Sequence, residues 1–328
     1  MPIALPSLLE RIQRNKKPMH KDGTMKLLGD IGGTRARLAL TDGGQRLQEV
    51  RVFLNDDYAD FNSLLAEYLG PLAQTPTSAC LAVAGPIADD GHSARLTNRD
   101  WRINLPQLTQ QFGLTQARLV NDFAAAAMGV TIDTDSDPVT LQDGAPLADA
   151  LRLVIGAGTG LGVASLILNE NRWRVLPGEG GHIGFAPQDE TQDGLCHWLR
   201  EQHGRVIIEH VVSGGGLAAI HDYLHGRRLA PVEISQLAHQ GDIQGLASFD
   251  LFASIYGAVA GDYALARAAR GGVFLAGGVA AANLDLMQRG PFLKAFGAKG
   301  VHSTLAARMP VHIVTEPLLG LYGAACLE

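Results

Sequence analysis

The chain has 328 residues, of which 46% are hydrophobic and 18% are charged, and its formal net charge at pH 7 is −6. This length is ample for two globular domains or one large one, and the composition is not that of a disordered chain. The negative charge argues against a surface for nucleic acid, which is usually basic, whereas backbone amides can still hold a small anionic ligand.

The cysteines and the hydropathy of the chain indicate its cellular compartment. The three cysteines, Cys80, Cys196 and Cys326, form no C-x-x-C pair, so they indicate reduced thiols rather than a zinc ribbon or a disulfide framework. No apolar run approaches the ~18 residues of a membrane helix, and the N-terminus lacks the basic start of a secretory signal. We therefore expect a cytoplasmic protein with no membrane or nucleic-acid partner. Residues 1–24 are expected to form a partly disordered N-terminal extension.

The first predicted element is a strand, a tight turn and a second strand over residues 26–40, KLLGDIGGTRARLAL. The turn fits neither a Walker-type P-loop nor a dinucleotide fingerprint. Its glycines let the backbone approach an anion, and Thr34 adds a hydroxyl donor. Asp30 would repel phosphates unless a divalent cation lies between them, so we interpret the turn as a phosphate loop with a metal. The alternative is a plain hairpin in which Asp30 caps the turn.

The next predicted elements are a buried strand over residues 78–87 and a strand running into an alanine-rich helix over residues 117–130. Asn121 and Asp122 stand at the second junction, and either is a suitable N-cap for the helix. A carboxylate at the carboxyl end of a strand also lies where open α/β sheets build their sites. There Asp122 could accept a proton from an attacking hydroxyl, and both interpretations stay open.

A second glycine hairpin is predicted over residues 153–168, LVIGAGTGLGVASLIL, with Thr159 flanked by glycines. Alone, this glycine run has low specificity. Paired with the first hairpin, it forms a two-sided phosphate clamp. The two hairpins, more than a hundred residues apart, therefore indicate two related halves that face one ligand.

Farther along, PGEGGHIGF (177–185) separates Glu179 from His182 by glycines only, which is compatible with metal ligands, an acid/base pair, a clamp on a polar ligand or a simple turn. Residues 205–225 are predicted to form two helical stretches joined at glycines 214–216. Residues 249–269 show the period of a long buried helix, and residues 272–284 a strand, a glycine turn and a helix. The alternation of strands and helices indicates an α/β architecture.

Two histidines four positions apart, His221 and His225, are predicted to lie on a helix. They lack the Glu of an H-E-x-x-H zinc motif, so we interpret them as surface residues.

Six segments together resemble, in the same order, the motifs of the bacterial-type glucokinase family, within the hexokinase-like and actin-like superfamily of ATPases. These segments are LLGDIGGTRARLAL, LVNDF, GAGTGLG, PGEGGHIGFAP, IEHVVSGGGL and FLAGGV. The resemblance runs from about Lys26 to the C-terminus. It implies a two-domain α/β fold of the actin-like (ribonuclease H-like) ATPase class with a ligand cleft between the domains. The small domain would hold residues 25–132 and 315–328, and the large domain residues 133–314.

The resemblance also implies the reaction: ATP-dependent phosphorylation of glucose at its C6 hydroxyl, by a cytoplasmic homodimer. Sugar hydroxyls would be bound by Asn121, Asp122, Glu179, His182 and Glu209, which suits carboxylates that accept from adjacent hydroxyls. Asp122 would be the general base, and Asp30 would hold Mg²⁺ through water. The implied nucleotide-binding residues are Gly29, Asp30, Ile31, Gly32, Gly33, Thr34, Gly158, Thr159, Gly160, Gly277 and Gly278.

Two departures from the family pattern bear on affinity and specificity. Gly184 stands where some relatives carry Asp, and Gly215 stands where some carry Pro. The alternatives are a kinase for mannose, fructose or an N-acetylhexosamine, or a sugar-sensing regulator. The regulator would need a DNA-binding helix-turn-helix, for which residues 1–24 are too short. The phosphoryl donor stays open among ATP, ADP and polyphosphate.

Overall fold

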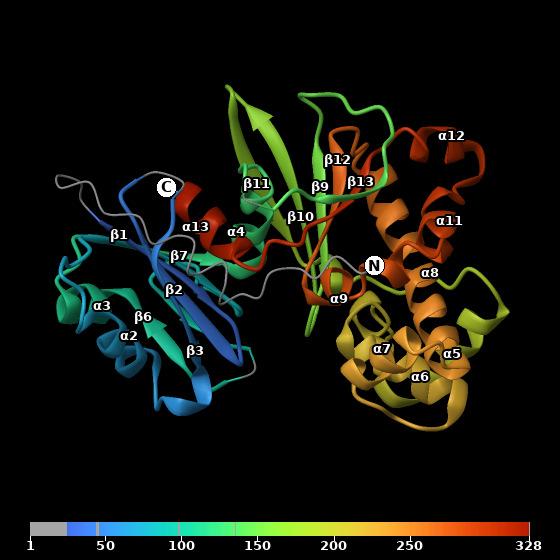
Figure 1. Ribbon diagram of the computed structural model, residues 1–328, viewed down its shortest axis with the longest axis horizontal. Coiled ribbons are helices and arrows are strands. Elements are labelled where there is room, and N and C mark those ends of the chain that lie inside the picture. Colours follow the sequence, from blue (N-terminus) through green and yellow to red (C-terminus); the bar gives the residue numbers. More distant parts are fainter. Residues whose placement is uncertain (1–24, 44–45, 98, 135, 328) are drawn as a thin grey trace. The chain divides into compact units, whose positions relative to one another are not determined.

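The computed structural model describes residues 25–43, 46–97, 99–134 and 136–327 and divides into two compact units (Figure 1). Unit 1 takes in Met1–Thr134 and Glu316–Glu328, and unit 2 takes in Asp135–Thr315. The expected extension over residues 1–24 lies outside the described residues.

Unit 1 is built on a five-stranded sheet with the order β3-β2-β1-β4-β7. The strands are β1 (Lys26–Ile31), β2 (Arg35–Thr41), β3 (Gln48–Leu54), β4 (Ser78–Val83) and β7 (Gln116–Asn121). The first three strands are antiparallel neighbours, whereas β4 and β7 run parallel to β1. Apolar residues bury both faces: Leu27 and Ile31 of β1 join one core cluster, and Leu28 joins the other. The predicted hairpin over residues 26–40 is confirmed, and the buried strand predicted over residues 78–87 is confirmed but ends earlier, at Val83.

Four α-helices cover the sheet of unit 1 among the described residues. They are α2 (Phe61–Leu69), α3 (Leu105–Phe112), α4 (Asp122–Gly129) and α13 (Leu319–Cys326), accompanied by the 3₁₀ turn η1 (Asn55–Asp57) and the small sheet of β5 (Ser93–Arg95) and β6 (Arg102–Asn104). Helices α4 and α13 pack closely because small residues face each other. A Cβ added at Gly323 would lie 1.7 Å from the carbonyl oxygen of Ala125, and one added at Gly129 would lie 2.3 Å from that of Leu319.

Unit 2 repeats the sheet topology of unit 1. Its sheet has the order β11-β10-β9-β12-β13-β8, made of β8 (Val139–Gln142), β9 (Arg152–Ala157), β10 (Leu161–Asn169), β11 (Arg172–Gly178), β12 (Gly272–Ala276) and β13 (Val311–Ile313). Strands β11, β10 and β9 are antiparallel, β12 and β13 run parallel to β9, and β8 adds an antiparallel edge. Each sheet therefore contains a glycine hairpin at the corresponding place, β1–β2 in unit 1 and β9–β10 in unit 2, and the prediction of two related halves is confirmed at the level of topology.

The helices of unit 2 surround its largest hydrophobic core. They are η2 (Gly180–His182), α5 (Glu190–His203), η3 (Ile208–His210), α6 (Gly214–His225), α7 (Pro231–His239), α8 (Ile243–Ala266), α9 (Gly278–Ala282), α10 (Leu284–Met287), α11 (Pro291–Gly297), η4 (Gly300–His302) and α12 (Ser303–Ala306). The predicted long helix is confirmed as α8, which begins earlier than expected because Asp242 is its N-cap and accepts from the amide of Gly245 at 2.8 Å. By length and composition alone α8 could cross a membrane, but 61% of its most apolar window is buried inside the protein.

The prediction for residues 205–225 is wrong in two respects. The first stretch forms only the short turn η3, and the glycines are the first turn of α6 rather than a joint between two helices. Ser213 is the N-cap of α6, and its Oγ accepts from the amide of Gly216 at 3.0 Å. A Cβ at Gly216 would lie 2.5 Å from the backbone of Val211, so close chain approach explains this glycine.

His221 is also not a surface residue. Only 1% of its surface is exposed, and its Nδ1 lies 2.8 Å from the hydroxyl of Ser248 in α8. It continues the apolar stripe of α6, four positions after Leu217, and this stripe packs into the core of unit 2. A histidine at a core position is tolerated here because its ring nitrogen has a polar partner.

Candidate active site

Asp30 lies in β1 near its carboxyl end and is paired across the sheet with Arg37. Arg37 Nη1 donates to Asp30 Oδ2 at 2.8 Å, and the two residues are register partners in β1 and β2. A Cβ at Gly320 of α13 would lie 3.0 Å from the carboxyl carbon of Asp30, so this glycine makes room for the carboxylate. Among the described hydrogen bonds, none joins the Asp30 carboxylate to an amide of its own turn. The alternative in which Asp30 caps the turn is therefore not supported.

The other residues of the first hairpin differ in whether their side chains are exposed or buried. Thr34 is exposed at the turn, whereas the side chain of Ile31 is fully buried in the core, so a contact from Ile31 to a ligand would use its backbone. A Cβ at Gly29 would lie 2.8 Å from a methyl group of Leu81. Gly29 is thus explained by strand packing, whereas Gly32 and Gly33 form the turn itself.

The junction of β7 and α4 gives Asn121 and Asp122 distinct positions. Asn121 is the N-cap of α4, and its Oδ1 accepts from the amide of Ala124 at 3.0 Å. The capping interpretation is therefore correct for Asn121, but the cap uses only its oxygen, and the NH₂ group keeps its donor capacity. Asp122 is the first residue of α4, where an anion interacts favourably with the helix macrodipole, and its Oδ1 accepts from the amide of Phe123 at 2.8 Å.

Asp30 and Asp122 both lie toward the carboxyl ends of parallel strands in the unit 1 sheet. Asp30 is in register with Ala82 of β4, which is in register with Val120 of β7, two residues before Asp122. The carboxyl ends of parallel strands lie at one edge of the sheet, so the two carboxylates belong to the same edge of unit 1.

In unit 2 the second hairpin is in contact with Glu209, 48 residues farther along the chain. Glu209 Oε2 accepts from the amide of Leu161 at 2.8 Å. A Cβ at Gly160 would lie 2.5 Å from the same oxygen, so a larger residue there would displace the carboxylate from this position. The turn is also tied to the start of α6, because the amide of Gly214 donates to the carbonyl of Gly158 at 2.8 Å. Thr159 is exposed at the tip.

The turn that carries Glu179 and His182 packs on β10 beside this hairpin. The amide of His182 donates to the carbonyl of Glu179 at 3.0 Å, and both side chains are exposed. A Cβ at Gly180 would lie 2.6 Å from that of Val163, and one at Gly181 would lie 2.5 Å from the carbonyl of Leu161. Gly180 and Gly181 are therefore required for packing, and the turn leaves the two polar side chains at the surface of the unit.

Backbone pairing between residues 183–184 and 207–208 brings Glu209 close to the turn that carries Glu179 and His182. Gly184 forms an isolated bridge with Ile207, and the amide of Ile208 donates to the carbonyl of Ile183 at 3.0 Å. Unit 2 thus brings together three of the predicted sugar-binding residues and the second hairpin. In the part of the chain that the structure describes, no group of three or more His, Cys, Asp or Glu side chains could hold a metal ion, so the metal interpretation of Glu179 and His182 is not supported.

The third glycine turn lies beside the second hairpin. Gly277 precedes α9 with φ of +87°, and an added Cβ there would lie 2.5 Å from the carbonyl of Ala157, at the end of β9. Gly278 has open space around the corresponding position. The first glycine is needed for conformation and packing, and the second leaves the backbone accessible to a ligand.

Sequence reasoning missed Tyr263 and His210, which contact the proposed sugar-binding turns. The hydroxyl of Tyr263, in α8, donates to the carbonyl of Gly180 at 2.6 Å, and burial raises its pKa to about 12. His210 follows Glu209 and lies 4.1 Å from His203, ring centre to ring centre, and burial and His203 lower its pKa. No local signal marks Tyr263, because it occupies an ordinary position in the apolar period of α8.

The fold is that of the actin-like ATPases, the class to which sugar kinases with two such α/β units belong. A glucokinase from an Antarctic psychrotroph superposes with a TM-score of 0.81 at 32% identity, over 93% of this chain and 98% of its own. A ROK family glucokinase from Streptomyces griseus, solved with glucose and AMPPNP, has the same fold with a TM-score of 0.62 at 22% identity, over 92% of this chain and 97% of its own.

The family is given by sequence. A family model described as Glucokinase matches residues 27–328. The glucokinase of Chromohalobacter salexigens is 40% identical over 306 residues, which cover 91% of this chain and 95% of that protein. The glucokinase of Photorhabdus laumondii is 35% identical over the same shares of both chains. The chain belongs to the glucokinase family.

Proposed function

We propose that the protein transfers the γ-phosphoryl group of ATP to the C6 hydroxyl of glucose, which yields glucose 6-phosphate and ADP. The observation that carries this proposal is the match to the glucokinase family over residues 27–328, a range that includes all of the proposed site residues. The relatives at 35–40% identity are named for this reaction.

Glucose would be bound by polar groups that the family resemblance assigns. In unit 1 these are Asn121, through the NH₂ group that its cap leaves unused, and Asp122. In unit 2 they are Glu179, His182 and Glu209. Ionised carboxylates accept from adjacent sugar hydroxyls, and such charge-assisted bonds are stronger than neutral ones. Glu209 already accepts from the amide of Leu161 through one oxygen, which fixes the direction of the other.

Asp122 would be the general base of the transfer. Its carboxylate accepts the proton of the C6 hydroxyl as the hydroxyl oxygen attacks the γ-phosphorus in line, and ADP leaves on the opposite side. The position of Asp122 at the first turn of α4, with its Oδ1 fixed by the amide of Phe123, supports this role because the carboxylate is held in one orientation. The two hairpins would hold the triphosphate through their backbone amides and through Thr34 and Thr159.

The surroundings of Asp30 fit a water-mediated contact with Mg²⁺ rather than direct coordination. Arg37 already binds one of its carboxylate oxygens, and the described residues offer no cluster of ligands for a metal. We propose that Asp30 receives the magnesium ion that arrives with the nucleotide, where the ion would neutralise the phosphate charge. Arg37 would keep the carboxylate in place.

The test is ADP release by the purified protein with a panel of sugars and donors. We expect the highest kcat/KM with glucose and ATP, and lower values with mannose, fructose and N-acetylglucosamine. A higher value with one of these sugars would replace glucose as the substrate, and turnover with ADP or polyphosphate in place of ATP would replace the donor. No turnover with any sugar, together with sugar binding, would point to a sensing regulator instead.

We further propose a cytoplasmic homodimer in which the two units are the two domains of the family fold. The free thiols of Cys80, Cys196 and Cys326 support a reducing compartment. Sedimentation equilibrium of the purified protein measures the mass directly, and a mass near 34.8 kDa, that of one chain, would contradict the dimer.

A further inference from the structure

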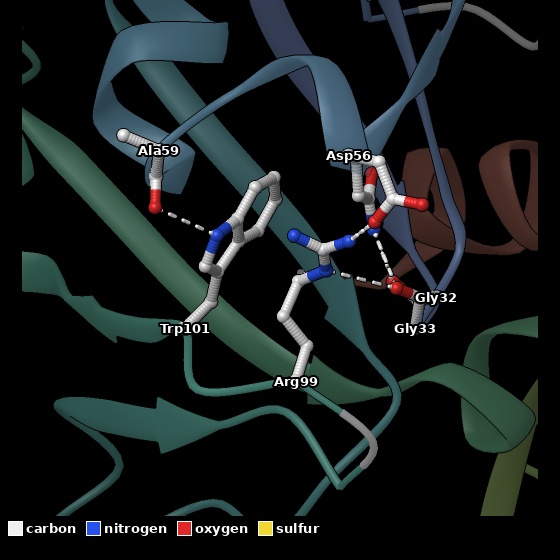
Figure 2. Close-up of polar contacts among 7 residues, drawn as sticks. Gly32, Gly33, Asp56, Ala59, Arg99 and Trp101 are labelled. Atoms are coloured by element: carbon white, nitrogen blue, oxygen red, sulfur yellow. Dashed lines mark hydrogen bonds and ion pairs between the residues drawn. The ribbon is translucent and has the colours of Figure 1, made fainter.

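The carbonyl groups of the first hairpin turn are bound by two side chains from outside the hairpin (Figure 2). Asn55, in η1, is fully buried, and its Nδ2 donates to the carbonyls of Gly32 at 2.8 Å and Gly33 at 3.1 Å. Arg99 Nε donates to the carbonyl of Gly33 at 3.2 Å. Both residues belong to unit 1, and neither lies in a motif that sequence analysis singled out.

These bonds fix the direction of the amides in the turn. The C=O and N–H of one peptide plane point in opposite directions. Holding the carbonyls of Gly32 and Gly33 toward Asn55 therefore turns the amides of Gly33 and Thr34 the opposite way. The remaining groups of the turn are already used, because the amide of Gly32 donates to the carbonyl of Arg35 and the carbonyl of Thr34 accepts from the amide of Asn55. Two adjacent N–H groups are thus presented together, as in an anion nest.

Arg99 is itself held in one conformation. Its guanidinium forms an ion pair with Asp56 and lies over the ring of Trp101, 4.9 Å from the ring centre. Trp101 is in turn buried and donates from Nε1 to the carbonyl of Ala59 at 3.1 Å. Figure 2 shows the side chain of Arg99 between Trp101 and the turn, with Asp56 beside its guanidinium. A cation that donates to the carbonyl of Gly33 also polarises the peptide that ends in the amide of Thr34, which strengthens that amide as a donor.

The hydrogen bonds of the Asn55 side chain explain why an amide rather than a carboxylate occupies this position. Its Oδ1 is buried and has no hydrogen-bond partner in the described part of the chain, whereas its NH₂ group makes both contacts with the turn. An unsatisfied buried acceptor is costly. Because the side chain keeps this position despite that cost, its two donor contacts determine where it lies. A carboxylate at this position would face two carbonyl oxygens and be repelled.

We propose that Asn55 and Arg99 are positioning residues that preorganise the Gly33 and Thr34 amides for the phosphate groups of the nucleotide. Neither side chain needs to touch the phosphates, because both act through the carbonyls on the far side of the turn. The inference rests on the proposed function of the hairpin as a phosphate loop and adds to it the groups that set its geometry. A turn that is fixed before binding loses less entropy when the anion arrives.

The experiment compares Asn55→Asp, Arg99→Gln and Arg99→Lys with the parent protein, and measures calorimetric affinities for ATP, adenosine and glucose, each alone. The matched control is Arg95→Gln, which removes an exposed ion pair with Asp100 in the same part of unit 1. We expect Asn55→Asp and Arg99→Gln to weaken ATP binding about tenfold or more, while adenosine and glucose affinities stay within about twofold of the parent. Arg99→Lys should recover part of the loss, and the control should bind all three ligands as the parent does.

Two results would overturn the inference. One is unchanged ATP affinity in both Asn55→Asp and Arg99→Gln. The other is an equal loss of adenosine and glucose affinity, which would make the two residues general supports of the fold. Thr34→Pro, which removes the Thr34 amide, separates this failure from that of the phosphate loop. If Thr34→Pro loses ATP affinity while the Asn55 and Arg99 variants keep it, only the positioning role is wrong. If Thr34→Pro also keeps it, the hairpin does not bind phosphate.

Discussion

Units 1 and 2 share one sheet topology and one kind of glycine hairpin, but they make that hairpin rigid by different means. In unit 1 the side chains of Asn55 and Arg99 bind the carbonyls of the turn. In unit 2 backbone from the start of α6 and the carboxylate of Glu209 perform the same task. The glycine turn is therefore common to both units, whereas the groups that hold it differ.

The proposed reaction is also divided between the units. Unit 1 contains both carboxylates proposed for the phosphoryl transfer, Asp30 and Asp122. Unit 2 contains Glu179, His182 and Glu209, three of the five residues proposed for the sugar, while Asn121 and Asp122 of unit 1 are the other two. The comparison is broken if the unit 1 base proves dispensable for the transfer or if the unit 2 residues prove dispensable for sugar binding, and the predictions below test this in order of expected size.

The largest effect is expected from Asp122→Asn in unit 1. The amide retains the shape and the position at the first turn of α4 but cannot take a proton, so kcat should fall by ~10²–10⁴. Glucose affinity, measured by calorimetry without nucleotide, should stay within a few-fold of the parent. Asn121→Ala serves as the contrast: the loss of the N-cap should lower the free energy of unfolding by about 1 kcal/mol. A kcat of Asp122→Asn within a few-fold of the parent would rule out the general base.

A selective loss of sugar affinity is expected from Gly160→Ala in unit 2. The added Cβ would lie 2.5 Å from Glu209 Oε2 and would displace this carboxylate. Glucose affinity should drop about tenfold, the size expected when a charged hydrogen-bond partner is misplaced. The matched control is Gly158→Ala, two residues earlier in the same turn, where an added Cβ has no atom within 4 Å. Calorimetry with glucose checks both variants, and equal glucose affinity in the two would contradict the role of Glu209.

A smaller effect is expected from Tyr263→Phe, which removes the donor to the carbonyl of Gly180 beside Glu179. The free energy of unfolding should fall by about 1 kcal/mol, and glucose affinity should weaken a few-fold because the turn is held less firmly. Tyr256→Phe is the control on the same helix: Tyr256 donates to the carbonyl of Ile155 at 3.1 Å in the core. It should lose similar stability in urea unfolding while its glucose affinity stays unchanged. The reverse pattern would show that Tyr263 does not support the sugar site.

The smallest effect is expected in the pH dependence of stability, and we assign it to unit 2. Burial is the main cause that lowers the pKa of His210, His221 and His312 below the ordinary value of 6.5. Below pH 6.5 the unfolded chain therefore binds more protons than the folded one, and the free energy of unfolding falls as the pH drops toward the folded pKa values. Urea unfolding between pH 8 and 5.5 measures this slope. His221→Gln should reduce it, and an unchanged slope would mean that His221 titrates alike in both states.

Sequence patterns predicted the elements whose signals are local. The two hairpins, the strand and helix around Asn121, and the long helix α8 are confirmed, because alternation, helical period and glycine turns are properties of adjacent residues. The prediction around Gly214–Gly216 was wrong because a run of glycines usually indicates the end of a helix. Here the glycines begin α6, and the close approach of Val211 explains why Gly216 has no side chain. Short strands such as β8 and β13 carry too few residues to show a period.

The candidate site divides in the same way. The motif residues proposed for glucose and ATP follow from the family resemblance, and they stay predictions that the experiments above test. The burial of His221 was missed because its partner, Ser248, is 27 residues away on another helix. Asn55 and Arg99 lie in segments with no recognisable motif, and only the folding of unit 1 brings them to the glycine turn.

The sequence by itself determined where the glycine turns lie, which of them carry carboxylates, and that the chain has two related α/β halves, because these depend on residues that are neighbours in the chain. Only the tertiary structure decided what holds each turn: Asn55 and Arg99 in unit 1, Glu209 and Tyr263 in unit 2. The contacts between these residues and their turns join positions 22 to 83 residues apart. Contacts at such separations are set by how the elements pack, and a linear pattern does not record them.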